Sequence, residues 1–177
     1  MNEIVMEYGG GLYSLAEESG LEKVILSETR MLSPLLTDEY VHLLINPDIP
    51  KSERIALISE LLDGRVHEYL ASFVKLMTER GIATEIRGCF EEYERLYYET
   101  SGIVRVTAES TVELTDAQKS RLADKLTAHV GHPVEIEYVI NRALIGGMRL
   151  SYNNKLIDDS VASKLKEIGE RLAGVVV

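Results

Sequence analysis

The chain has 177 residues, of which 45% are hydrophobic, and a formal net charge of -10. This length is enough for one full-sized core or two small ones. No apolar run is long enough to span a membrane, and the N-terminus lacks the basic start and apolar stretch of a signal peptide, so we expect a soluble, cytoplasmic protein. Residues 1–101 hold 19 acidic and 9 basic side chains while residues 102–177 hold 10 of each, and the acidic part argues against a nucleic-acid partner because it repels phosphate.

In the first 101 residues, apolar positions recur at steps of three and four, which predicts successive amphipathic helices. Glycine and proline mark their ends, at Gly20, Pro34, Pro47, Gly64 and Gly81. The predicted helices cover residues 4–16, 21–35, 38–45, 51–62, 66–77 and 84–100. Six short helices with brief connections predict a compact bundle.

At Ser101 and Gly102 the apolar period changes from about 3.6 to 2, so we place a domain boundary there, between residues 1–101 and 102–177. Residues 103–109 and 134–140 alternate as strands do, and a third strand is predicted over 144–152. A capping box at Thr115–Gln118 opens a helix that Gly131 ends, and a last helix is predicted from Val161. The predicted fold is α+β, a six-helix bundle followed by a small β-α-β-β-α domain.

Three consecutive glycines, Gly9, Gly10 and Gly11, fall inside the first predicted helix. Each interior glycine costs roughly 1 kcal/mol relative to alanine, so something must compensate. One interpretation is that the helix is frayed or interrupted. The other is that Gly9 and Gly11 form the floor of a groove where another helix comes close, as small residues do in tight helix packing.

The residues that could hold a metal ion or react with a substrate form no recognisable site. The single cysteine, Cys89, has no metal-binding spacing around it and is expected to be a small buried side chain. The four histidines are scattered, and the two nearest, His129 and His132, bracket a glycine at a helix end. We therefore predict no metal site, no cofactor and no catalytic centre.

Two local patterns invite a chemical interpretation, but each has a simpler structural one. Asp158 and Asp159 could act as a carboxylate pair, yet Ser160 and a helical stripe follow at once, which favours capping of a helix N-terminus. Gly146 and Gly147 lack the lysine and the spacing of a phosphate-binding loop and lie in a strand pattern, which favours a bulge or a close backbone approach.

Several segments together resemble the delta subunit of rotary F-type ATP synthases, a relative of the oligomycin-sensitivity-conferring protein. The strongest match joins the run Leu144-Ile145-Gly146-Gly147 to Leu156-Ile157-Asp158-Asp159-Ser160-Val161, with Leu165 downstream. Weaker matches are residues 8–13, Asn46-Pro47 with Lys51, and residues 73–81. The chain departs from the family pattern at the triple glycine, where alanines are usual, and at Ala143, where serine is frequent.

The resemblance implies a non-catalytic stator connector in proton-driven ATP synthesis. In that role residues 1–101 grip the N-terminal helices of alpha subunits, and residues 102–177 hold the peripheral stalk b subunit. It also implies a location at the inner face of the cell membrane, with membrane contact only through the complex. By position in the family, the groove for the alpha helix lies between the first and fifth helices, lined by Tyr8, Gly11, Leu12, Leu15, Phe73, Leu76 and Met77.

Two other functions fit parts of the same sequence. A cytoplasmic adaptor that binds another amphipathic helix would show the same helical pattern, and only the C-terminal motif and the spacing over both domains favour the stator. A small α/β enzyme using Asp158, Asp159 and His132 is the third class. The lack of a recognisable catalytic arrangement argues against it.

Overall fold

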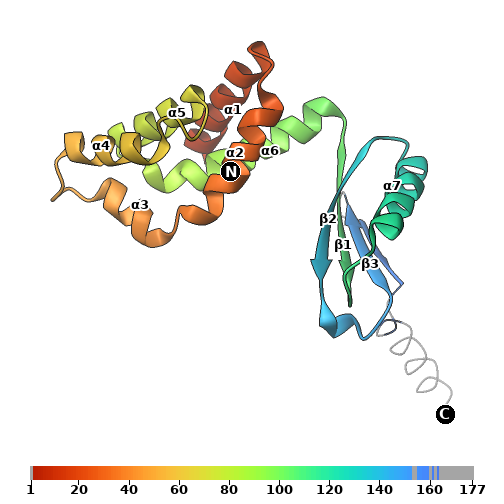
Figure 1. The fold of residues 1–177 in the computed structure, drawn as a ribbon. Coiled ribbons are helices and arrows are strands. Elements are labelled where there is room, and N and C mark those ends of the chain that lie inside the picture. Colours follow the sequence, from red (N-terminus) through yellow and green to blue (C-terminus); the bar gives the residue numbers. More distant parts are fainter. Residues whose placement is uncertain (1, 153–154, 160, 162, 164–177) are drawn as a thin grey trace, which may run out of the picture. The chain divides into compact units, whose positions relative to one another are not determined.

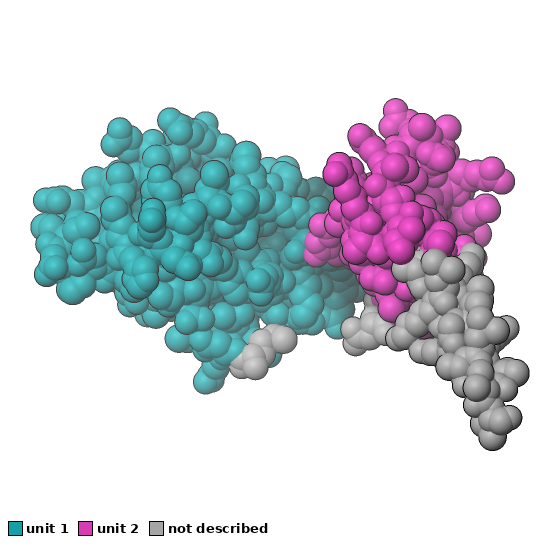
Figure 2. Space-filling view, turned by 90° about the horizontal axis from the view of Figure 1, so that it is seen from below, with its two compact units in different colours: residues 1–99 teal, residues 100–177 magenta. Residues whose placement is uncertain are grey.

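The computed structural model describes residues 2–152, 155–159, 161 and 163, and the chain divides into two compact units, residues 1–99 and 100–177. Figure 1 shows the helical N-terminal unit and the small sheet unit, and Figure 2 colours the two units separately. The fold is therefore of the mixed α+β class, and the boundary lies two residues before the one expected from the sequence.

Unit 1 consists of helices joined by short turns (Figure 1). They are α1 (Glu3–Glu18), α2 (Glu22–Leu32), η1 (Ser33–Leu35), α3 (Asp38–Ile45), α4 (Lys51–Leu62), α5 (Glu68–Glu79), η2 (Ala83–Glu85) and α6 (Ile86–Ser101). The predicted ranges 38–45 and 51–62 coincide with α3 and α4, and Pro34 lies in the 3-10 turn η1, where a break was predicted. Since α1 runs without interruption through all three glycines, the interpretation of an interrupted helix is wrong.

Side chains cap the N-termini of α1 and α5. The Asn2 side chain accepts a hydrogen bond from the Ile4 N–H at 3.2 Å and begins α1. His67 begins α5, because its Nδ1 accepts from the Tyr69 N–H at 3.3 Å. The His67 N–H donates to both carboxylate oxygens of Glu28 on α2, each at 2.9 Å. The start of α5 is thereby held by its own cap and by a second helix.

Fully buried side chains from several helices form the core of unit 1. Ile25, Leu70, Ile86 and Tyr93 are all 0% exposed, and burial of such a side chain stabilises by about 1.5–3 kcal/mol. The Tyr93 ring lies edge-on to Tyr13 with centroids 5.5 Å apart. The Tyr93 hydroxyl donates to the Glu22 carbonyl at 3.0 Å. Helices α1, α2, α5 and α6 therefore share one core.

Glycines allow α1 and α6 to approach each other closely. A Cβ at Gly9 would lie 2.8 Å from the Cys89 carbonyl oxygen and 2.9 Å from Glu92 Cβ. A Cβ at Gly88 of α6 would lie 2.9 Å from a methyl group of Val5. All three distances are too short for a real Cβ, so this crossing requires glycine on each helix.

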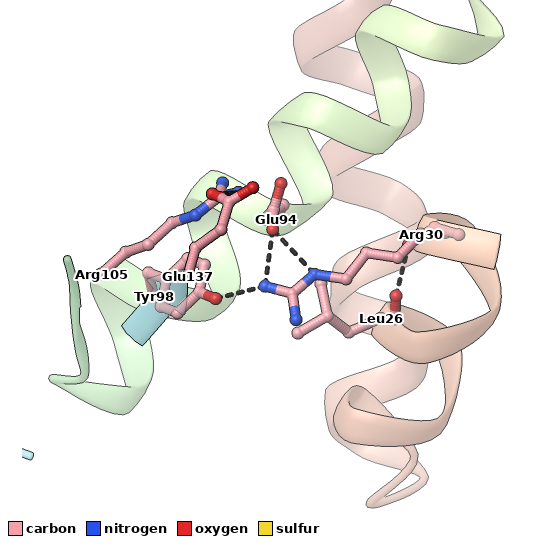
Figure 3. Close-up of polar contacts among 7 residues, drawn as sticks. Leu26, Arg30, Glu94, Tyr98, Arg105 and Glu137 are labelled. Carbon is pink, nitrogen blue, oxygen red and sulfur yellow. Dashed lines mark hydrogen bonds and ion pairs between the residues drawn. The ribbon is translucent and has the colours of Figure 1, made fainter. Parts of the chain in front are cut away.

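Polar contacts join α2 to α6 at the surface of unit 1 (Figure 3). Arg30 Nε donates to Glu94 Oε1 at 2.9 Å, and Arg30 Nη2 forms an ion pair with the same oxygen at 2.7 Å. The same guanidinium donates to the Tyr98 hydroxyl and lies 5.7 Å from the centre of its ring. Exposed ion pairs contribute at most about 1 kcal/mol, so this cluster orients α6 more than it stabilises the unit.

Unit 2 is a four-stranded sheet in the order β2-β1-β3-β4. Its strands are β1 (Val104–Ser110), β2 (Val134–Ile140), β3 (Met148–Tyr152) and β4 (Lys155–Asp158). β1 pairs in parallel with β2 through the crossover helix α7 (Asp116–Val130), and the other pairs are antiparallel. The predicted capping box is confirmed, because Thr115 and Gln118 bond to each other's backbone, and Gly131 ends α7 with φ 77°.

The two faces of the sheet differ in chemistry. Val106 and Ala108 of β1 and Leu126 of α7 are buried, and Figure 1 shows α7 lying along the sheet. On the other face of the sheet, Arg105 forms an ion pair with Glu137 at 3.0 Å, and Arg149 forms one with Asp158 at 3.0 Å. One face therefore packs into the core, and the other carries charges that neutralise each other.

The predicted order β-α-β-β-α omits one strand near its end. The third strand begins at Met148 instead of 144, and Leu144 is buried in a 3-10 turn. A fourth strand follows, and its last residue, Asp158, is ion-paired to Arg149. Ser160 and most of the predicted last helix lie outside the described residues.

Candidate helix-binding groove

Helices α1 and α5 lie antiparallel, which places a groove between them. At one end the Ser19 hydroxyl, just after α1, donates to the Tyr69 hydroxyl near the start of α5 at 3.4 Å. At the other end Tyr8 of α1 and Leu76 of α5 line the same hollow. The end of α1 therefore meets the beginning of α5, and the two helices form opposite walls.

The hollow between these helices has a volume of about 410 Å³. Six of the seven side chains predicted for the alpha-helix groove line it: Tyr8, Gly11, Leu12, Leu15, Phe73 and Leu76. Leu12 and Phe73 are only 4% and 7% exposed and form its floor, while Leu15 and Leu76 are 40% and 38% exposed and form its rim. An apolar groove of this form accepts the apolar face of an amphipathic helix.

Gly11 opens onto this groove and Gly9 does not. No atom lies within 4 Å of the position that a Cβ would take at Gly11. Gly9 lies on the opposite side of α1, against α6. The predicted close approach of another helix is found at Gly9, against α6, whereas binding of a helix at Gly11 stays a prediction. The two glycines differ because residues two apart in a helix point about 200° away from each other.

Met77, the seventh predicted residue, does not line the groove. Its side chain is 0% exposed and belongs to the core of unit 1. The preceding residue, Leu76, is the one on the groove side of α5. Consecutive residues of a helix point about 100° apart, so an apolar run such as Leu76-Met77 divides between two surfaces.

Three further residues line the groove that sequence reasoning missed: Glu7, Tyr69 and Ser72. All three lie one helical turn from a predicted residue, at Gly11, Phe73 and Leu76. The helical period alone could have found them, since neighbours at steps of three and four share a face. They were missed because the predicted groove residues were taken only by their position in the family resemblance.

A second apolar hollow of about 350 Å³ lies elsewhere in unit 1 and was not predicted. Side chains of α2, η1, α3, α4 and α5 line it, among them Met31, Leu35, Tyr40 and Leu61, which are 53%, 61%, 52% and 43% exposed. Exposed apolar side chains that cluster mark a binding surface for another molecule more often than scattered ones do.

The C-terminal motif is brought together by unit 2. The Val161 N–H donates to the Gly146 carbonyl at 2.9 Å, and a Cβ at Gly146 would lie 3.1 Å from a Val161 methyl group. Gly147 has φ 83°, and Ile145 has φ 63°, a rare conformation for a β-branched residue. The glycines precede β3 instead of lying within it, and they serve the close backbone approach that was one of the two predicted roles.

The described residues were compared with the requirements of a metal site and of a reactive thiol. No group of three His, Cys, Asp or Glu side chains in the described ranges could hold a metal ion. Burial and the nearby Glu85 carboxylate raise the pKa of the Cys89 thiol to about 11, which keeps it in the unreactive thiol form. No helix among the described residues is long and apolar enough to cross a membrane.

Comparison with known proteins gives the family. The family model described as ATP synthase delta (OSCP) subunit matches residues 4–172, so the chain belongs to the delta/OSCP family, whose members are structural, non-catalytic stator subunits of ATP synthase. ATP synthase subunit delta of Prochlorococcus marinus strain MIT 9312 is 32% identical over 98% of both chains. ATP synthase subunit delta of Acetivibrio thermocellus is 29% identical over 97% of this chain and 98% of the relative.

A solved structure shares the fold. A chain in the cryo-EM structure of the Toxoplasma gondii mitochondrial ATP synthase hexamer aligns with a TM-score of 0.70 over 97% of this chain and 98% of that one. Its sequence identity is only 11%, so this likeness concerns the fold alone.

Proposed function

We propose that the chain is the stator connector that links the catalytic head of an F-type ATP synthase to its peripheral stalk. In this function the α1/α5 groove binds the N-terminal helix of an alpha subunit, and unit 2 holds the b subunit of the stalk. The protein then lies at the inner face of the membrane and contacts it only through the complex. It resists torque during proton-driven ATP synthesis and catalyses no step.

The groove is the observation that supports the head contact. Its residues on α1, from Glu7 to Leu15, span about 12 Å of helix, which corresponds to roughly two turns of a partner helix. The buried floor of Leu12 and Phe73 provides an apolar surface for anchors at i, i+3 or i+4, and i+7. A stator subunit acts only by holding its partners together, so its function depends on a non-covalent contact of this kind.

The head contact is tested by titration calorimetry of the full chain with a synthetic peptide that spans the N-terminal helix of the alpha subunit from the same organism. We expect one-to-one binding, and we expect Gly11→Leu to weaken it at least about tenfold, because the new side chain fills the open space at Gly11. Ser14→Leu is the matched control, since it adds the same side chain to an exposed position of α1 outside the groove.

Circular dichroism and urea denaturation must show that both variants stay folded. If the folded wild-type chain does not bind the peptide, the head contact is wrong, and the adaptor function with another helical partner takes its place. If Gly11→Leu binds as well as Ser14→Leu, the partner helix binds elsewhere on unit 1, and the second hollow becomes the candidate.

Unit 2 is the proposed stalk-binding part of the chain, and the family match, which extends through it to residue 172, supports this proposal. The test is capture of the b subunit's soluble domain by the full chain and by a chain that ends at Gly102. We expect the full chain to capture it and the shortened chain to fail. Capture by the shortened chain would move the stalk contact to unit 1.

A further inference from the structure

The two helices that form the groove carry almost no positive charge. α1 contains four glutamates and no lysine or arginine, and α5 contains two glutamates and one lysine. That lysine, Lys75, is ion-paired with Asp63 after α4 at 2.7 Å, so its charge is balanced. The groove therefore presents a negative field to any helix that enters it.

Glu7 is the only charged side chain among the described residues that line the groove. It is exposed, and within the described part of the chain no partner forms a hydrogen bond or an ion pair with its carboxylate. Two other glutamates of the same two helices are engaged, since Glu17 accepts from the Tyr13 hydroxyl at 3.5 Å and Glu79 pairs with Lys51 at 3.1 Å. Glu7 thus has its full charge available for a molecule that enters the groove.

Gly11 lies one helical turn from Glu7 on the same wall and presents bare backbone to the groove. Helix axes normally lie 8–10 Å apart, at a distance that depends on the side chains between them. A partner helix can come nearest at Gly11, provided that its facing side chain is small. Along the α1 wall, the negative charge of Glu7 is therefore followed one turn later by Gly11, where a partner helix can approach closely.

We propose that Glu7 and Gly11 together set the register of the bound helix: the occupant carries a lysine or arginine that pairs with Glu7 and, one turn away, a small side chain that packs on Gly11. This inference rests on the proposed function, in which the occupant is the N-terminal helix of the alpha subunit. It adds to that function the residue of this chain that selects the partner by charge.

The charge pair lies at the rim of the groove, so it acts mainly on association. Rim charges steer the encounter and change the association rate more than the dissociation rate. Their effect falls as salt screens them, over about 10 Å at 0.1 M ionic strength. An exposed pair of this kind is expected to change affinity about twofold to fivefold.

The test measures association and dissociation rates of the full chain with the synthetic alpha-subunit peptide at low and high salt. Glu7→Gln should slow association about twofold to fivefold at low salt, leave dissociation nearly unchanged, and flatten the salt dependence. Glu17→Gln is the matched control on the same helix outside the groove, and it should behave as the wild type does, because glutamine keeps the oxygen that accepts the Tyr13 hydrogen bond.

Replacement of each basic residue of the peptide by glutamine, one at a time, locates the partner of Glu7. One replacement should slow association with the wild type and have no effect with Glu7→Gln, and a small residue should lie one turn from that position. If Glu7→Gln and Glu17→Gln have the same rates, the charge assignment is wrong while the groove function stands. If the folded wild type binds no peptide at all, the groove function is overturned and this assignment with it.

Discussion

The two sides of helix α1 meet different surroundings, and the three consecutive glycines are divided between them. On one side Gly9 lies so close to α6 that a Cβ there would be 2.8 Å from a backbone oxygen. On the other side Gly11 faces the groove with no atom within 4 Å of a Cβ. The cost of glycine is the same at both positions, but it is offset by tight packing at Gly9 and, in the proposed function, by a bound helix at Gly11. Substitutions on the two sides should therefore have opposite effects on stability.

The largest effect is expected for Gly9→Val. The branched side chain cannot fit against the Cys89 carbonyl, so α1 must move away from α6, at a cost of about 3 kcal/mol in the free energy of unfolding. Urea denaturation measures this loss. Gly10→Val is the control, because its Cβ would meet only the end of Leu96, at 3.9 Å, and its effect should stay within about 0.5 kcal/mol. Equal losses for the two variants would contradict the close crossing.

A smaller effect on the free energy of unfolding is expected when the pH is raised, and it acts through Cys89 on the packed side of α1. Burial raises the pKa of Cys89 from 9.0 to about 11, so the folded chain keeps a proton that the unfolded chain loses near pH 9. The corresponding stabilisation is fully present below pH 9 and is lost as the pH rises toward 11, with a total on the order of 2 kcal/mol.

The measurement is the free energy of unfolding between pH 8 and 11 in the wild type and in Cys89→Ala. The difference between the two profiles isolates the thiol, because burial also raises the pKa of Tyr93, and that contribution is present in both proteins. Parallel profiles would show that the thiol is not buried against α1.

The smallest effect is expected on the open side of the helix. Gly11→Ala should raise the free energy of unfolding by about 1 kcal/mol, because alanine is the better helix former and its methyl group meets no atom. Gly9→Ala is the matched change on the packed side and should lower stability. A loss for Gly11→Ala in urea denaturation would mean that Gly11 also packs within the free protein.

The helices were predictable where their ends are marked by local chemistry. Thr37 caps α3 by accepting from the Tyr40 N–H, and the pair Thr115 and Gln118 caps α7. A few adjacent residues therefore determine where each of these two helices begins. β4 was missed for the opposite reason. Its four residues are too few to show a period, and the strand is held by its pairing with β3, where Arg149 forms an ion pair with Asp158. That information lies in another strand and not in the local pattern.

The groove was predictable only in part. The apolar stripes of α1 and α5 identify residues that face other helices, but they do not separate the chain's own core from a surface left open for a partner. Met77 and Leu76 are adjacent and equally apolar, yet one is buried and the other lines the groove. Glu7 carries no apolar signal, and its proposed role follows only from its position one turn from Gly11 and from the lack of a partner among the described residues.

The parallel pairing of β1 with β2 also bears on the order in which a newly made chain folds. Every residue of unit 1 precedes residue 100. Strand β1 ends at Ser110, and its parallel partner β2 is complete only when Ile140 has been added, so β1 must wait for it. At a synthesis rate of about 5–20 residues per second, that wait lasts roughly 2–6 s. We expect the groove to be complete on the ribosome before the sheet exists, so a chain released early would present the surface proposed to bind the catalytic head without the unit proposed to hold the stalk.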